Sequence, residues 1–140
     1  MRLFIDCEWN GRGGEMISIA LVPDTGYGEF YQEFEVSAPY DPWVAENVVP
    51  HLVGIQRDSK LVQISLGDYL AVFNRVHIIA DWPEDIERFC RLLITGPGTR
   101  LDTPPLTMEI VRVDAPSEVP HNALSDARGI RNFFNHMRTV

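Results

Sequence analysis

The sequence predicts an α/β domain with a mixed sheet of five strands, in which three antiparallel strands precede two parallel ones and helices flank the sheet. The first part of the chain carries three apolar or aromatic runs joined by short turns, and the later part alternates strand and helix patterns. At 140 residues the chain is long enough for one hydrophobic core. We therefore expect a single domain over residues 1–140.

The first predicted strand spans residues 3–9 (LFIDCEW) and carries two acidic residues in its second half. Its opening apolar run is typical of a strand buried in the middle of a sheet. Asp6 and Glu8 are two positions apart, so in a strand both side chains lie on the same face. Adjacent carboxylates repel each other unless a cation lies between them, and Mg²⁺ prefers such oxygen ligands. The alternative is that both residues end the strand and face water.

Turn-forming residues separate the next predicted strands and the first predicted helix. Residues 10–14 (NGRGG) predict a hairpin turn, because they do not precede a helix as a phosphate-binding glycine loop does. Apolar runs predict strands over residues 15–22 and 27–36. Asp41 as the N-cap and Pro42 at the first helical position predict a helix that continues over residues 43–49.

The later part of the chain reads as alternating helices and strands. We expect a short helix over residues 65–73 and a buried strand over residues 76–80. A helix that starts near Pro83 follows, because apolar residues at helical spacing continue to residue 93. A fifth strand over residues 106–113 and a last helix from Asn122 complete the pattern.

Further acidic residues fall at the starts of these helices. Asp81 follows the strand over residues 76–80, and Asp85 falls in the first turn of the next helix. In the last helix His121 precedes Asp126 by five residues, so both side chains can reach the same end of the helix. Two alternatives remain open: Asp126 is an exposed helix carboxylate, and His121 caps the helix or lies at the surface.

These segments resemble the motifs of the DEDDh 3′–5′ exonucleases, a family with a ribonuclease H-like fold. The matching segments are residues 4–8 (FIDCE), 81–85 (DWPED) and 121–128 (HNALSDAR), in family order and over nearly the whole chain. The start, the second strand and the short length are most similar to the RNase AS-like exoribonucleases. The middle motif departs from the usual Asn-x-x-Phe-Asp, because Asp81 replaces the Asn. Asp85 is then the expected ligand, and Asp81 competes for that role.

The resemblance implies a metal-dependent exoribonuclease that shortens single-stranded RNA from its 3′ end and releases nucleoside 5′-monophosphates. It implies two Mg²⁺ or Mn²⁺ ions that take part in an in-line displacement. Asp6 would bridge both ions, and His121 would be the general base. The full set of implied metal ligands is Asp6, Glu8, Asp85 and Asp126.

Substrate contacts are expected beside these ligands. Glu8, Trp9 and Asp81 are the candidates, with Trp9 stacking on a terminal base. An ordinary core position is the alternative for Trp9. The expected partner is the 3′ end of single-stranded RNA, and the resemblance favours a homodimer. No residue pattern in the sequence indicates recognition of the ribose 2′-hydroxyl, so single-stranded DNA is an alternative substrate. A non-catalytic binding module is an alternative function.

Net charge and hydropathy limit the functions and locations that the sequence allows. The net charge of −8 argues against a broad nucleic-acid-binding surface, which is normally basic. It is compatible with a nuclease that holds a few terminal nucleotides, because bound metal ions reverse the local charge. No apolar run approaches the ~20 residues that span a bilayer. The two cysteines lie in apolar sequence and the start lacks a secretory signal, so we expect a cytoplasmic protein without a membrane partner.

Overall fold

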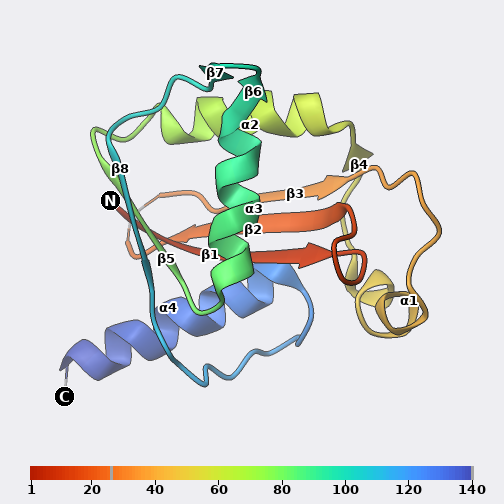
Figure 1. Cartoon of the computed structure of the whole chain (residues 1–140). Coiled ribbons are helices and arrows are strands. Elements are labelled where there is room, and N and C mark those ends of the chain that lie inside the picture. Colours follow the sequence, from red (N-terminus) through yellow and green to blue (C-terminus); the bar gives the residue numbers. More distant parts are fainter. Residues whose placement is uncertain (26, 140) are drawn as a thin grey trace.

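The structure is a computed structural model that describes residues 1–25 and 27–139. Within these residues a six-stranded mixed sheet lies between helices (Figure 1). Its strands are β1 (Arg2–Trp9), β2 (Met16–Pro23), β3 (Phe30–Phe34), β4 (Gln56–Arg57), β5 (Val76–Ala80) and β8 (Leu106–Ile110). The helices are α1 (Pro42–Asn47), the 3-10 helix η1 (Val49–His51), α2 (Ser59–Leu70), α3 (Pro83–Leu93) and α4 (Ala123–Thr139). A small separate hairpin consists of β6 (Ile94–Gly96) and β7 (Thr99–Arg100).

The strand order is β4-β3-β2-β1-β5-β8. β1, β2 and β3 pair antiparallel, whereas β5 pairs parallel with β1 and β8 pairs parallel with β5. The α/β class and the antiparallel-then-parallel arrangement are therefore confirmed. The predicted strand count of five is wrong, because β4 adds a parallel strand outside β3. Both residues of β4 are exposed, so no apolar pattern marks this strand in the sequence.

Helices cover both faces of the sheet (Figure 1). On β1 the odd-numbered side chains Leu3, Ile5 and Cys7 belong to the main core, together with buried residues of α2 and α3. The even-numbered Phe4 packs instead with Ile130 of α4. Because side chains alternate along a strand, Asp6 and Glu8 lie on the face that α4 covers.

The predicted hairpin turn and first helix are confirmed. In the turn between β1 and β2, a Cβ on Gly14 would lie 1.8 Å from the carbonyl oxygen of Asn10, so the turn requires glycine there. At α1 the carboxylate of Asp41 accepts a hydrogen bond of 3.0 Å from the backbone N–H of Trp43, as expected of an N-cap.

The start of α2 and the chain after α3 differ from the prediction. α2 begins at Ser59 rather than at residue 65, because Asp58 caps it with a 2.9 Å hydrogen bond from the N–H of Lys60. α3 ends at Leu93, as predicted, and the chain then forms the β6–β7 hairpin, which the sequence did not predict. Among the described residues, none of the helices combines the length and the apolar character needed to cross a bilayer.

Candidate metal centre

The central strand β1 presents two carboxylates to the face that α4 covers. β1 lies between β2 and β5, and its pairing with β5 runs only from Arg2 to Phe4. Asp6 and Glu8 follow that paired segment. The Oδ2 atom of Asp6 is buried and has no hydrogen-bond partner. Burying a carboxylate oxygen without a hydrogen-bond donor costs free energy, and a bound cation or another ligand would offset that cost.

The start of α3 brings further carboxylates to β1. Asp81 directly follows the last residue of β5, and Asp85 falls in the first turn of α3. Since β1 is no longer paired with β5 at this level, the backbone N–H of Cys7 is free and donates to Oδ1 of Asp85 at 3.0 Å. Asp85 is only 2% exposed. This hydrogen bond fixes the Asp85 side chain beside Asp6 and Glu8.

The start of α4 brings the last carboxylate. α4 approaches the sheet closely, because the small side chains of Ala123 and Ala127 pack on Ala20 and Val22 of β2. Asp126 lies in the first turn of α4, and its Oδ2 accepts a hydrogen bond of 3.1 Å from the backbone N–H of His121. The alanine packing thus holds the start of α4 against the sheet, and the His121 hydrogen bond orients the Asp126 carboxylate there.

The five acidic side chains form two groups that share Asp6. Ligand atoms of Asp6, Asp81 and Asp85 all lie within 4.8 Å of one another. The same limit of 4.8 Å holds for Asp6, Glu8 and Asp126. Both groups could hold a metal ion. The predicted ligands therefore come together, and Asp81 joins Asp85 in one group instead of replacing it.

Burial and mutual repulsion dominate the electrostatics of the cluster. Burial, followed by the charge of Asp85, raises the pKa of Asp6 well above its ordinary value. Burial and the neighbouring charge of Asp126 raise the pKa of Glu8 to about 8. Burial likewise raises the pKa of Asp85 to about 8, against the opposing effect of the Cys7 hydrogen bond. The carboxylates are therefore destabilised as anions unless a cation balances them.

His121 lies at the edge of the same cluster. It lines a pocket of about 270 Å³ together with Asp6, Asp81 and Asp126. Its ring contacts the indole ring of Trp43 in α1 edge to face, with 5.0 Å between the ring centroids. The sequence analysis missed Trp43, because nothing in the sequence relates α1 to the start of α4. The signal available in the sequence was a tryptophan in the first turn of the predicted helix, directly after Pro42.

The structure does not bring Trp9 to this cluster. Trp9 is an odd-numbered residue of β1 and packs against the main core on the other face. The guanidinium of Arg88 in α3 lies 5.1 Å from the centroid of the Trp9 ring. Arg88 also donates to the carbonyl oxygen of Gly14 and to Glu84, so it ties α3 to the turn after β1. This arrangement agrees with Trp9 as a packing residue and gives no support to stacking on a base.

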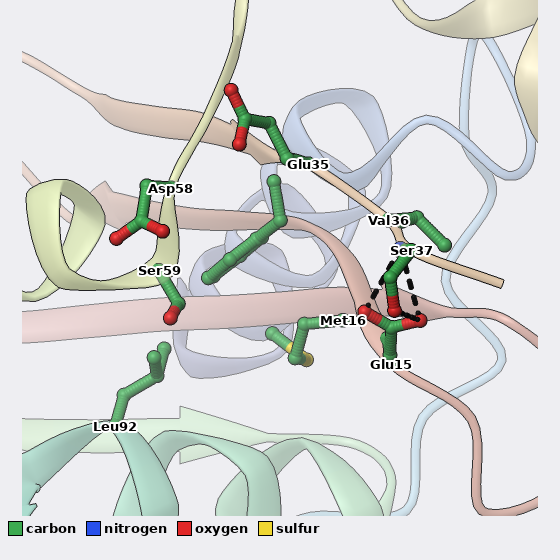
Figure 2. A pocket seen from close by; sticks show the side chains of 9 residues that line it. Glu15, Met16, Glu35, Val36, Ser37, Asp58, Ser59 and Leu92 are labelled. Carbon is green, nitrogen blue, oxygen red and sulfur yellow. Dashed lines mark hydrogen bonds between the residues drawn. The ribbon is translucent and has the colours of Figure 1, made fainter.

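A larger cavity, of about 550 Å³, lies elsewhere (Figure 2). Phe34 and Leu92, which belong to the main core, line it, so it opens on the face away from Asp6. Figure 2 shows Glu15 at its edge, where the carboxylate accepts hydrogen bonds from the backbone and hydroxyl of Ser37. None of the clustered carboxylates lines this cavity. Size alone therefore does not locate the candidate site.

Comparisons of the chain with protein families, with curated proteins and with solved structures returned no match. The fold and the cluster define an α/β protein with a mixed sheet and a carboxylate site that could hold a metal ion. The relation to the DEDDh exonucleases rests on the sequence motifs and stays a prediction.

Proposed function

We propose that the chain is a 3′–5′ exoribonuclease of the DEDDh type, with a ribonuclease H-like fold, that depends on divalent metal ions. The observation that carries this proposal is the sharing of Asp6 between two carboxylate groups whose ligand atoms lie within 4.8 Å of one another. Two-metal phosphodiesterases need such an arrangement, because one carboxylate must serve two neighbouring ions. The three antiparallel strands followed by two parallel ones also support the proposal.

The residues fit two hard divalent cations. All donors in the cluster are carboxylate oxygens, which Mg²⁺ and Mn²⁺ prefer, and the described residues bring no cysteine or histidine into either group. A cation would satisfy the unpartnered Oδ2 of Asp6 and would stabilise the ionised forms of Glu8 and Asp85, whose pKa values are raised. When bound, the ions would supply Lewis acidity and charge stabilisation during in-line attack on a phosphodiester.

The protein residues around the cluster would position the reactants. His121 lines the pocket that contains Asp6 and Asp126, which supports a role for its imidazole as the base that accepts a proton from the attacking water. Trp43 restricts the His121 ring through the edge-to-face contact. A single-stranded 3′ end suits the pocket, because the net charge of −8 disfavours the binding of a long duplex.

Matched RNA and DNA oligonucleotides with a labelled 5′ end test the proposal. We expect stepwise shortening of the RNA from its 3′ end with Mg²⁺ or Mn²⁺ and no shortening in excess EDTA. Asp6→Asn should abolish the reaction, because both carboxylate groups lose their shared member. Faster degradation of the DNA would reassign the substrate. Undiminished degradation in EDTA, or none under any condition, would refute the proposed activity.

The family resemblance also leads us to propose a homodimer. Static light scattering at the concentration used for the activity assays measures the mass directly. Twice the chain mass is expected. A monomeric mass at that concentration would reject the dimer and leave the proposed activity to its own test.

A further inference from the structure

A second pocket adjoins the candidate metal centre. It has a volume of about 370 Å³ and is lined by Asp81, Trp82, Arg112, Val113 and Asp114. Asp81 also lines the pocket that contains Asp6 and His121, so the two pockets are neighbours. The backbone N–H of Val111 donates to the carbonyl oxygen of Ala80 at 2.8 Å, which holds the segment after β8 against the start of α3.

Trp82 offers an aromatic face in this pocket. It occupies the N-cap position of α3, yet its side chain makes no capping hydrogen bond. The residue is 59% exposed, and no ring or cation contact within the described part of the chain involves it. Position and exposure therefore leave the indole available to a ligand. Exposed aromatic residues beside a concave site are typical of binding surfaces.

Arg112 adds a positive charge to an otherwise acidic region. It is exposed and forms no ion pair within residues 1–25 and 27–139, although acidic residues outnumber basic ones in this chain. A guanidinium group binds phosphate through paired N–H donors. Asp114 also lines the pocket, and its carboxylate is an acceptor that suits hydroxyl or amino groups rather than an anion.

We propose that this pocket is a nucleotide subsite that holds one of the two nucleotides flanking the phosphate at the metal centre. The base stacks on Trp82, Arg112 contacts a backbone phosphate, and Asp114 accepts from the sugar or base. The subsite rests on the proposed nuclease function. Its volume lies within the ~300–1,000 Å³ typical of ligand pockets. The shared Asp81 makes a nucleotide bound here continuous with a phosphate at the acidic cluster.

Kinetics on two substrates test the subsite separately from the chemistry. A short RNA oligonucleotide can occupy the pocket, whereas bis(p-nitrophenyl) phosphate carries no nucleotide. We expect Trp82→Ala to lower the ratio of kcat/KM for RNA to kcat/KM for the small ester about tenfold, mainly through KM. Trp82→Phe keeps an aromatic ring and should keep the ratio near that of the parent. Arg112→Ala should lower the ratio and the salt dependence of RNA binding, and Arg100→Ala on the separate hairpin is its matched control.

Binding measurements test the nucleotide subsite even if the protein shows no turnover. Titration of an RNA trinucleotide should quench tryptophan fluorescence, and Trp82→Ala should remove most of that quenching. An unchanged RNA-to-ester ratio in Trp82→Ala, or quenching that survives it, would overturn the subsite. A parent protein that hydrolyses neither substrate would refute the nuclease function, and Trp82-dependent quenching would then still support a nucleotide site.

Discussion

His121 stands out at the scale of single residues because its backbone is strained. Among the described residues it is the one non-glycine residue with a positive φ, 69°. A side chain in this region costs of order 1 kcal/mol or more and persists only where neighbours enforce it. Here the neighbours are Asp126, which accepts from the His121 N–H, and Trp43, which packs on the ring. A strained backbone beside an acidic cluster agrees with the role proposed for this imidazole.

We predict that His121→Asn lowers kcat for RNA hydrolysis by about 10²–10⁴ and leaves KM nearly unchanged, since proton transfer contributes that much. Asparagine tolerates positive φ, so the backbone keeps its conformation while the titratable ring is lost. Steady-state kinetics on the RNA substrate measure both constants.

The matched control is His77→Asn. The His77 ring hydrogen-bonds Thr107 and Glu109 on β8 and lies outside the pocket at the cluster. It should leave kcat within about twofold of the parent, because no proton transfer depends on it. If His121→Asn kept full kcat, or lost Mg²⁺ affinity together with kcat, the imidazole would be structural and not a base.

Asp85 and Asp81 share a group with Asp6 but differ in burial. Asp85 is buried and held by the Cys7 N–H, whereas Asp81 is half-buried at the end of β5. We predict that Asp85→Asn weakens Mn²⁺ binding more than Asp81→Asn does, because a fixed carboxylate loses no freedom on binding. Isothermal titration calorimetry with Mn²⁺ compares the two variants. The reverse order would make Asp81 the main ligand of that group.

At the scale of elements, the start of α4 sets the positions of both His121 and Asp126. The Oδ1 atom of Asn122 accepts a hydrogen bond of 3.0 Å from the N–H of Ser125, the geometry of an N-cap. Its Nδ2 donates to the carbonyl oxygen of His51 at 2.9 Å and so joins α4 to η1. One side chain thus fixes the helix start and ties it to the segment after α1.

Asn122→Ala should therefore lower the free energy of unfolding by about 1–2 kcal/mol, since a cap and a second hydrogen bond are lost together. Urea unfolding followed by circular dichroism measures this. Asn122→Ser keeps a capping oxygen but not the bond to His51, so about half of the loss is expected there. Equal losses in both variants would show that the cap contributes nothing.

The elements that the sequence predicted are those whose patterns are local. β1, β2 and β5 are apolar runs, and Asp41 with Pro42 marks α1 whatever the fold around it. β4 escaped prediction because two exposed residues form a strand only through backbone pairing with β3. The β6–β7 hairpin likewise depends on pairing across Gly98, which has a φ of +68°.

The same distinction applies to the candidate site. Alternation along a strand places Asp6 and Glu8 together, and helix-start patterns mark Asp85 and Asp126. The distance between these pairs depends on how α3 and α4 pack on the sheet, which no local pattern contains. The sequence therefore left open whether Asp81 or Asp85 is the metal ligand of the middle motif. In the folded structure both lie beside Asp6. The order of the motifs predicted which residues belong to the cluster, and the packing of α3 and α4 on the sheet determines how close they lie.

At the scale of the whole molecule, the acidic cluster that could hold a metal ion lies where β1 meets the starts of α3 and α4. β1 contributes two carboxylates, and the chain at the starts of α3 and α4 contributes the other three. The two helices lie on opposite faces of the sheet (Figure 1). Packing these elements together requires that five acidic side chains approach one another. The native fold therefore carries an electrostatic cost in the absence of metal, and bound cations would remove it.

This cost predicts how stability depends on pH. The pKa of Glu8 is raised from 4.5 to about 8 and that of Asp85 from 3.8 to about 8. A carboxyl whose pKa is higher in the folded state than in the unfolded state binds its proton more tightly when folded. The folded state is therefore destabilised in full at a pH above its carboxyl pKa values of about 8. This destabilisation decreases as the pH falls toward the unfolded-state pKa values of 4.5 and 3.8.

In EDTA we therefore predict a melting temperature that is higher at about pH 6 than at about pH 8.5, by differential scanning fluorimetry. Mg²⁺ should reverse the trend, because it binds the ionised cluster and raises the melting temperature more at the higher pH. Asp6→Asn combined with Asp126→Asn removes two of the repelling charges, and it should flatten the pH dependence in EDTA and abolish the response to Mg²⁺. A melting temperature in EDTA that falls on acidification, with no response to Mg²⁺ at either pH, would show that these side chains neither repel one another nor bind a cation.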